Sequence, residues 1–222
     1  MWYIVFGVSF LFIGCGEEFI ERNNPMGINP ALLIVDMQKD FCPGGALGVA
    51  GGDEIIPIIN CYIGLFMERK LPIIASRDWH PARTKHFKEF GGIWPAHCVQ
   101  GSDGAMFSEG LLLPPETLVF SKGIDPDRDD YSALHGRNDT ETPLMEFLIN
   151  EEIQHLYICG LATDYCVRQT ALEGLRHGFA VTVLVDAVRG VELQTGDSER
   201  ALNEMESAGA AFAHLGELRP GD

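Results

Sequence analysis

Short apolar runs alternate along this sequence with longer stretches whose apolar residues recur at helical spacing. The clearest run, ALLIVD at 31–36, is apolar until its final acid, which is the pattern of a strand buried on both faces of a sheet. Such runs predict strands at 31–36, 71–76, 117–121, 156–160, 180–186 and 210–214. Helical spacing predicts helices at 53–70, 142–150, 163–177 and 197–208. The alternation predicts a doubly wound α/β fold: a mainly parallel six-stranded sheet with helices on both faces, in a Rossmann-like three-layer sandwich.

The sequence divides into an apolar N-terminal extension, residues 1–26, and one domain, residues 27–222, without internal repeats or linkers. Residues 1–15 carry no charge, and they are fewer than the roughly 20 residues that a membrane-spanning helix needs. They also lack the basic residues that normally precede the apolar part of a signal peptide. Two interpretations stay open: an export or lipoprotein signal with Cys15 near its cleavage site, or a true translation start at Met26.

The charge balance excludes several classes of partner. With 16 Lys and Arg against 32 Asp and Glu, the chain has a formal net charge of −16. Nucleic acids and anionic membrane surfaces both need a basic face, so neither is an expected partner of the domain. Six cysteines without a CxxC pair indicate reduced thiols rather than a disulfide scaffold. We expect a cytoplasmic protein with a small-molecule substrate, exported or lipid-anchored only if residues 1–15 are a real signal; a homo-oligomer stays open.

Reactive side chains follow four of the predicted strands at their carboxyl ends. Asp36 ends the first strand, and Asp78 with His80 follows the second. Lys122 follows the third strand, and Cys166 comes shortly after the fourth. In open parallel sheets ligands bind beyond the carboxyl ends of the strands. We therefore expect these side chains to converge on one site.

Cys166 has the strongest local case for reactivity. Thr163 is a candidate N-cap for the helix 163–177, which places the thiol in the first helical turn, where the helix dipole lowers a thiol pKa. Lys122 would lower the pKa further, and Asp36 could accept the proton as general base. The alternative is a buried, unreactive cysteine beneath a helix, which is the commoner situation for a free thiol.

Side chains that bind metals gather in the irregular segment 78–115. Asp78 and His80 are two residues apart and share a face if the strand reaches them, and His86 and His97 follow. One carboxylate with two or three imidazoles suits zinc, manganese or iron, with open positions for water or substrate. The alternative is a set of surface histidines in a polar loop.

A second irregular segment, 123–139, contains a dense acidic run. Its members are Asp125, Asp127, Asp129 and Asp130. The run lacks the glycine and the terminal glutamate of an EF-hand calcium loop, so we interpret it as a solvated loop. Both irregular segments exceed the usual loop length, which indicates a functional role for the edge they border.

Five segments carry a resemblance to a known family. They are IVDMQKDFCPGGAL at 34–47, RDWHP at 77–81 with WPAHCVQG at 94–101, FSKGIDPDRDDYSAL at 120–134, GLATDYCVRQTALE at 160–173 and VLVDAV at 183–188. In order and spacing they resemble the nicotinamidase/pyrazinamidase group of the isochorismatase-like cysteine hydrolases, and the resemblance spans 31–215. Asp129 and Asp130 depart from the family pattern, in which a serine commonly precedes the tyrosine found here as Tyr131.

The resemblance implies roles for individual residues. It implies a catalytic triad of Asp36, Lys122 and Cys166. The implied metal ligands are Asp78, His80, His97 and His86, the last matching a ligand present in only some members. The implied substrate contacts are Phe41, Trp94, Leu161, Ala162 and Tyr131. The resemblance also implies a cis peptide bond between Leu161 and Ala162, and an oxyanion hole formed by the amides of Ala162 and Cys166.

The resemblance also implies a reaction. The chain would be a metal-containing cysteine amidohydrolase that converts nicotinamide to nicotinate and ammonia through a thioester, and it would also act on pyrazinamide. One divalent ion is implied, zinc, with manganese or iron as alternatives. The nearest alternative is an isochorismatase-like hydrolase of another small amide or carbamoyl compound, but those metal-free members lack the aspartate–histidine cluster present here. A non-catalytic binding protein on the same scaffold is disfavoured because all three triad residues are present.

Overall fold

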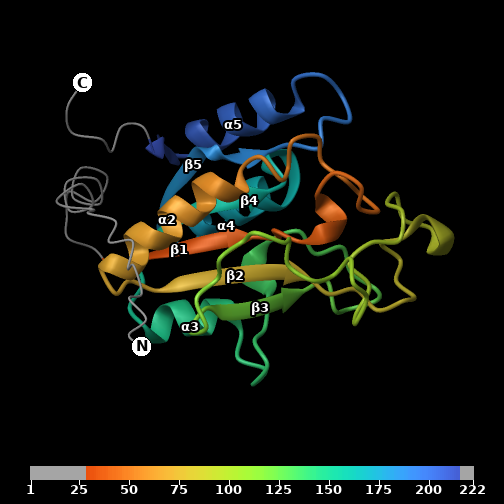
Figure 1. The fold of residues 1–222 in the computed structure, drawn as a ribbon, viewed down its shortest axis with the longest axis horizontal. Coiled ribbons are helices and arrows are strands. Elements are labelled where there is room, and N and C mark those ends of the chain that lie inside the picture. Colours follow the sequence, from red (N-terminus) through yellow and green to blue (C-terminus); the bar gives the residue numbers. More distant parts are fainter. Residues whose placement is uncertain (1–28, 216–222) are drawn as a thin grey trace, which may run out of the picture.

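A computed structural model describes residues 29–215 and shows a six-stranded sheet in which all neighbouring strands are parallel (Figure 1). The strands are β1 (Pro30–Val35), β2 (Ile73–Asp78), β3 (Leu118–Lys122), β4 (His155–Leu161), β5 (Ala180–Arg189) and β6 (Ala211–Ala213). Their order across the sheet is β3-β2-β1-β4-β5-β6. The chain runs from the centre to one edge, returns beside β1 and continues to the other edge, which confirms the doubly wound fold.

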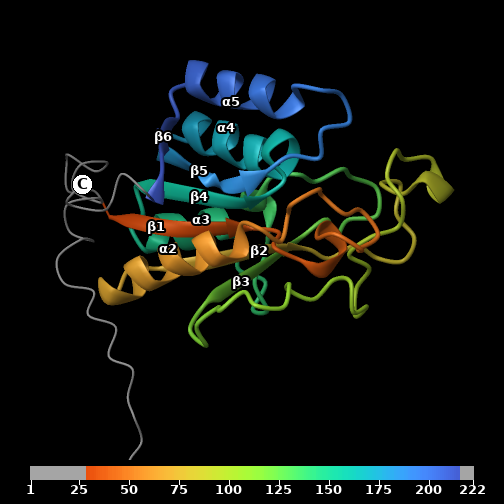
Figure 2. The ribbon, with the colours of Figure 1, turned by 45° about the horizontal axis from the view of Figure 1, so that its top comes forward.

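Helices cover both faces of the sheet (Figure 2). The α-helices are α2 (Ile56–Glu68), α3 (Leu144–Asn150), α4 (Arg168–Arg176) and α5 (Asp197–Ser207). On one face, Phe66 of α2 shares a buried cluster with Leu32 of β1. On the other face, side chains of α3, α4 and α5, among them Ala171, share a second cluster with Leu33. The three layers expected from the sequence are therefore present.

β1 shows why the apolar run at the centre of the sheet is continuous. Every residue of this strand is buried, because successive side chains point to opposite faces and helices cover both. Leu32 and Ile34 contribute to the cluster beneath α2, whereas Leu33 and Val35 contribute to the other. Full burial of a leucine or isoleucine side chain stabilises a protein by roughly 1.5–3 kcal/mol, so this strand anchors the sheet.

Most of the element boundaries differ from the prediction by one to five residues, and two of these differences have a clear cause in hydrogen bonding. The second strand begins at Ile73 rather than at residue 71, because the amide of Leu71 donates to the carbonyl oxygen of Phe66 at 3.0 Å and still belongs to the turn that ends α2. Helix α2 begins at Ile56 rather than at residue 53. The carbonyl oxygen of Asp53 accepts a 3.2 Å hydrogen bond from the amide of Ile56, so the preceding residues form a separate turn.

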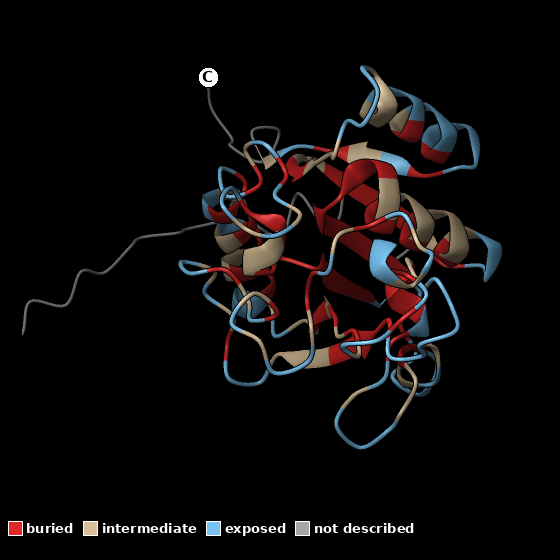
Figure 3. Cartoon of the chain, turned by 90° about the vertical axis from the view of Figure 1, so that its right-hand side faces the viewer, coloured by how far each residue is buried: buried red, intermediate tan, exposed pale blue. Residues whose placement is uncertain are grey.

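Two long segments leave the carboxyl ends of β2 and β3, at 79–117 and 123–143. They contain only the short 3₁₀ turns η2 (Lys88–Phe90) and η3 (Ala133–His135). Figure 3 looks onto this edge, where largely exposed loops surround a buried centre. The segments correspond to the irregular stretches expected from the sequence, and they border the edge at which the reactive residues were expected.

The N-terminal extension predicted at residues 1–26 lies outside the described residues. Between residues 29 and 215, no helix has the length and apolar character needed to cross a membrane.

Candidate active site

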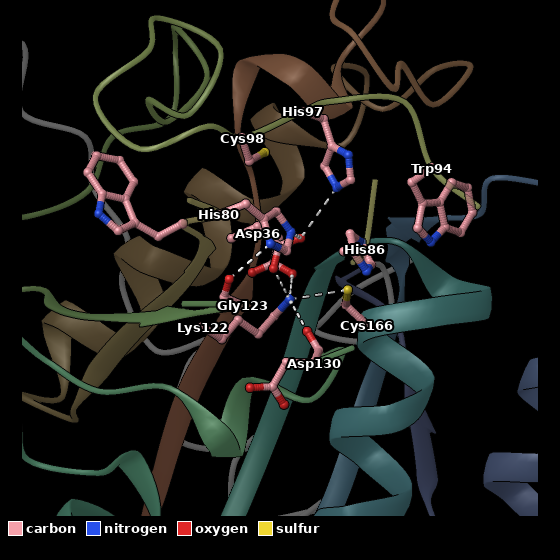
Figure 4. Close-up of polar contacts among 12 residues, drawn as sticks. Asp36, His80, His86, Trp94, His97, Cys98, Lys122, Gly123, Asp130 and Cys166 are labelled. Carbon is pink, nitrogen blue, oxygen red and sulfur yellow. Dashed lines mark hydrogen bonds and ion pairs between the residues drawn. The ribbon is translucent and has the colours of Figure 1, made fainter. Parts of the chain in front are cut away.

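Four side chains on or just after neighbouring strands meet at the carboxyl edge of the sheet, and Figure 4 shows Asp36, Lys122 and Cys166 among them. Lys122, the last residue of β3, lies opposite Asp78, the last residue of β2. The lysine Nζ lies 2.9 Å from Oδ2 of Asp36 and 3.4 Å from Sγ of Cys166, and it donates to Oδ1 of Asp78. All four residues are buried. The structure thus brings together the three residues that the sequence predicts as a triad.

The approach of the strands at this edge depends on a glycine. Gly160 of β4 lies opposite Val35 of β1. Its φ is +109°, and a Cβ atom there would lie 2.1 Å from the carbonyl oxygen of Val35. Only glycine allows this conformation and this contact. The next peptide bond but one, between Leu161 and Ala162, is cis, as the resemblance predicts.

The charge states of the cluster follow from its burial and its pairing. Burial opposes the charge on Lys122, but Asp36 and Asp78 outweigh it and raise the pKa of the ammonium group, which stays protonated. Burial raises the pKa of Asp36, against the opposing charge of Lys122. Burial acts in the same direction on Asp78, but Lys122 and His80 outweigh it and lower the pKa of that carboxyl. Asp36 is thus the better proton acceptor of the two, and Ser76 Oγ donates a 2.7 Å hydrogen bond to its Oδ1.

Cys166 differs from the expectation of an activated thiol. Burial raises its pKa, Lys122 acts in the opposite direction, and the nearby carboxylates add to the increase. The predicted lowering of the thiol pKa is therefore wrong for the resting protein, because removal from water opposes the thiolate more than one lysine favours it. The thiol keeps its proton until a base removes it.

The turn that carries Cys166, η4 (Thr163–Val167), is π-helical. The amide of Val167 donates at 3.1 Å to the carbonyl oxygen of Ala162, five residues earlier. Thr163 is the first residue of this wider turn and provides no side-chain cap. The predicted α-helical first turn with Thr163 as N-cap is therefore wrong. Single π-helical turns are frequent at functional sites.

Three histidines form a second buried cluster beside the triad. Nitrogens of His80, His86 and His97 lie within 4.8 Å of one another, and the rings of His80 and His86 stack with centroids 4.6 Å apart. Each ring uses Nδ1 for a hydrogen bond: His80 with the carbonyl of Gly123 (3.0 Å), His97 with that of Pro95 (2.8 Å) and His86 with the carboxylate of Asp129 (2.6 Å). Such outer contacts orient the opposite nitrogen of a metal-binding histidine.

The inner nitrogens of this cluster fit a divalent metal ion. Nε2 of His80 is buried and has no hydrogen-bond partner among the described residues. It lies 3.6 Å from Oδ2 of Asp78, and Nε2 of His97 lies 3.9 Å from the same oxygen. Burial lowers the pKa of His97 to about 4 and also lowers the pKa of His86. Neutral imidazoles beside one carboxylate are the ligand set of many divalent metal sites.

Part of the acidic run in segment 123–139 reaches the site, contrary to the expectation of a solvated loop. The carboxylate of Asp129 contacts His86, as described above. The main-chain oxygen of Asp130 accepts a hydrogen bond from Lys122 Nζ at 3.4 Å. Asp125 and Asp127 are exposed, as expected. The pattern of charges could not reveal the difference, because the contacts of Asp129 with His86 and of Asp130 with Lys122 depend on the path of the folded loop.

An aromatic pocket opens beside Cys166 and the histidines. It holds about 340 Å³, part of it open to solvent, and is lined by Phe41, Leu47, Asp78, His86, Trp94, His97, Tyr131, Ala162, Tyr165, Cys166 and Val191. Four of the predicted substrate contacts, Phe41, Trp94, Tyr131 and Ala162, are among these residues. Leu161 is not: its side chain is 1% exposed and belongs to the core.

Three aromatic rings frame this pocket. Nε1 of Trp94 donates a 3.0 Å hydrogen bond to the hydroxyl of Tyr131, and the ring of Trp94 meets Tyr165 edge-on with centroids 4.9 Å apart. Sequence reasoning missed Tyr165, Leu47 and Val191 as pocket residues. The position of Tyr165 directly before the predicted nucleophile was an available signal. Leu47 and Val191 are single apolar residues in separate loops, and no pattern distinguishes them.

Comparisons with known proteins agree with this geometry. A family model described as "Isochorismatase domain" matches residues 30–217. The chain is 42% identical to a nicotinamidase of Escherichia coli (strain K12) over 202 residues, covering 83% of this chain and 94% of the relative. It is 38% identical to a nicotinamidase/pyrazinamidase of Mycobacterium tuberculosis, covering 80% and 95%. A solved pyrazinamidase of Pyrococcus horikoshii in complex with zinc is similar with a TM-score of 0.78 and 47% identity, covering 84% of this chain and 99% of that one. The chain belongs to the isochorismatase family.

Proposed function

We propose that this protein is a metal-containing nicotinamidase, which hydrolyses nicotinamide to nicotinate and ammonia. One observation carries the proposal: Cys166, which contacts Lys122, lines the same aromatic pocket as His86 and His97 of the histidine cluster. Relatives named nicotinamidase at 35–42% identity support the choice of substrate. Hydrolysis is the reaction expected of a buried cysteine with a carboxylate and a lysine beside it.

In the first half of the reaction, Asp36 accepts the thiol proton of Cys166, whose sulfur lies within 4.8 Å of a carboxylate oxygen of Asp36. The sulfur attacks the carboxamide carbon, and the carbonyl electron pair moves onto oxygen. We propose that the main-chain amides of Ala162 and Cys166 stabilise this oxyanion. Lys122 offsets the negative charge that builds up among the buried groups.

The tetrahedral intermediate then collapses. The C–N bond breaks, the leaving nitrogen takes the proton from Asp36, and ammonia departs while a thioester remains on Cys166. In the second half, water attacks the thioester carbon and gives a proton to Asp36. The C–S bond breaks, Asp36 returns the proton to the sulfur, and nicotinic acid leaves and loses its remaining proton to solvent as nicotinate. One carboxylate thus serves as base and acid in both halves.

The proposed ligands of the metal are Asp78, His80, His97 and His86. Zinc is the proposed ion, as in the solved pyrazinamidase complex, with manganese or iron as alternatives. When bound, the ion supplies a positive charge beside the pocket that can attract a ring nitrogen or a water molecule. Three of the four proposed ligands, Asp78, His86 and His97, also line the pocket and so form part of the wall against which the substrate ring would lie.

The walls of the pocket favour a flat heteroaromatic amide. Phe41, Trp94 and Tyr131 present ring faces and edges, so pyrazinamide should be accepted as well as nicotinamide. The alternative within the family is a metal-free hydrolase of linear carbamoyl compounds. The cluster of three histidines disfavours it, because a metal-free enzyme does not need a metal-binding cluster.

A substrate panel tests this proposal. We expect the purified, metal-loaded protein to release ammonia from nicotinamide and pyrazinamide with a kcat/KM at least about 100-fold above that for a linear N-carbamoyl amino acid, a gap within the range that pocket contacts supply. A protein that cleaves the carbamoyl compound and not nicotinamide would show the substrate assignment to be wrong.

A further inference from the structure

Residues 129–131 carry three contacts into the candidate active site, although no helix or strand includes them. The contacts join the Asp129 carboxylate to His86 (2.6 Å), the Asp130 main-chain oxygen to Lys122 Nζ (3.4 Å) and the Tyr131 hydroxyl to Trp94 Nε1 (3.0 Å). An irregular segment keeps such contacts only if other side chains fix it. Side chains on the outer side of this segment, away from the pocket, hold it in place.

His135, in the turn η3, holds the segment from its outer side. Its Nδ1 is hydrogen-bonded to the carboxylate of Asp130, and its Nε2 lies 2.8 Å from Oε1 of Glu173 on α4. The side chains of Asp130 and Glu173 are only 12% and 15% exposed, so both pairs are partly shielded from water. A single imidazole therefore joins the segment to a helix.

The contact between His135 and Glu173 of α4 is significant for the active site, because α4 begins directly after the turn that carries Cys166. Thr170 of the same helix adds a second connection, since its Oγ1 accepts a 2.9 Å hydrogen bond from the amide of Ala133. The ring of His135 thus links a wall of the pocket to the element that positions the nucleophile.

The chemistry of the ring suits this role. Both ring nitrogens face carboxylates, and only the doubly protonated imidazolium can donate to both. Although burial acts in the opposite direction, the hydrogen bonds and charges of Asp130 and Glu173 raise the pKa of His135. Hydrogen bonds between charged groups are stronger than neutral ones.

We propose that His135 is a positioning residue for the hydrolysis: by linking Asp130 to Glu173 it fixes Tyr131 as a wall of the substrate pocket. The expected change in KM rests on the proposed function, whereas the expected loosening of the segment does not. Lys122 keeps its contacts with Asp36 and Asp78 when the link is lost, so the triad stays in place while the wall loosens, and KM should rise more than kcat falls.

The test compares His135→Ala with His177→Ala in the metal-loaded protein. His177 lies 3.9 Å from the same Glu173 oxygen and does not take part in the Asp130 pair, so it is a matched control. For His135→Ala we expect KM for nicotinamide to rise about five- to tenfold, the order expected for one charge-assisted contact. We expect kcat to stay within about twofold and amide hydrogen exchange of residues 124–131 to become faster. His177→Ala should match the wild type in all three measurements.

Two variants of Glu173 distinguish the effect of its hydrogen bond to His135 from the effect of its negative charge. Glu173→Gln keeps an oxygen acceptor for the ring, so its KM should lie between those of the wild type and Glu173→Ala. An unchanged KM in His135→Ala, or an equal increase in His177→Ala, would overturn the proposal. If the wild type does not turn over nicotinamide, the proposed function fails, and hydrogen exchange alone tests the link through His135. Faster exchange in His135→Ala but not in His177→Ala would support the link, and equal exchange rates in the two variants would overturn it.

Discussion

At the scale of single residues, burial lowers the pKa of two histidines, His97 and His155, that have different roles. Burial lowers the pKa of each ring to about 4. His97 lies in the metal-binding cluster, where a neutral ring is the form that binds an ion. His155 lies at the start of β4, where it is 3% exposed and its Nε2 is 2.8 Å from Oγ1 of Thr182. The first is a site residue, and the second is a structural one.

Replacing His97 with alanine should reduce the metal content of the protein. Removal of one ligand from a four-residue set leaves too few donors to hold the ion firmly, so we expect the affinity to fall by at least about tenfold. Metal analysis of the purified variant measures this, with His177→Ala as the control because His177 lies outside the cluster. An unchanged metal-to-protein ratio in His97→Ala after dialysis would remove His97 from the ligand set.

His155 should make the protein less stable in mild acid. Its folded pKa of about 4 lies below the ordinary value of about 6.5, so the unfolded chain binds more protons between these values. The stabilising contribution is complete above pH of about 6.5 and is lost as the pH falls towards about 4, by at most about 3 kcal/mol. His155→Gln should lose less stability than the wild type over this interval in urea unfolding experiments. Parallel pH profiles for the two proteins would contradict this assignment, because His97 contributes equally to both.

At the scale of elements, the carboxyl ends of β1 and β4 set the geometry of the site. β1 ends before Asp36, and β4 leads through Gly160 and the cis peptide bond into the turn of Cys166. Because Gly160 lies directly against the main chain of Val35, a side chain at this position would push the two strands apart. The distance between the proposed base and the proposed nucleophile therefore depends on a residue that has no side chain.

Gly160→Ala should damage the protein far more than an ordinary glycine substitution. The added Cβ would meet the Val35 carbonyl at 2.1 Å, whereas a Cβ at Gly178, which has a similar φ of +88°, would meet no atom within 4 Å. Gly178→Ala should cost about 1 kcal/mol from its conformation alone. Gly160→Ala should cost at least about 3 kcal/mol and lower the rate of ammonia release. Equal unfolding free energies for the two variants would show that the strands can separate without strain.

The elements also show how far the sequence predicts this protein. All six strands were predictable from short apolar runs, and the signal is clearest in the central strands β1 and β4, which are buried on both faces along their whole length. The convergence of Asp36, Lys122 and Cys166 follows from the same parallel arrangement. The π-helical turn was not predictable, because its Val167–Ala162 hydrogen bond leaves no residue pattern that distinguishes it from an α-helical turn. The link through His135 was not predictable either, since it depends on a contact with Glu173, 38 residues away in the sequence. The raised pKa of Cys166 was missed because burial at this edge outweighs the charge of Lys122.

At the scale of the whole molecule, the net charge of −16 has little bearing on catalysis. Long-range fields accelerate the binding of charged ligands, and salt suppresses that effect. Nicotinamide carries no net charge, so the field neither attracts nor repels it. The charge instead disfavours polyanionic partners, in agreement with a small-molecule substrate.

Salt should therefore have little effect on the reaction. Between about 20 mM and about 500 mM sodium chloride, we expect kcat/KM for nicotinamide to change by less than about twofold at constant pH and saturating metal. Initial rates of ammonia release at low substrate concentration provide the measurement. A tenfold decrease over this interval would indicate a charged substrate or a salt-sensitive step in binding.

The most direct test of the whole account is ammonia release from nicotinamide by the metal-loaded wild type, Cys166→Ala and Cys61→Ala. Cys61 is an exposed cysteine on α2, so its variant controls for the loss of a thiol as such. We expect turnover by the wild type and by Cys61→Ala, and none by Cys166→Ala, with all three proteins folded and holding equal metal. Turnover by Cys166→Ala at a rate close to that of the wild type would contradict this expectation.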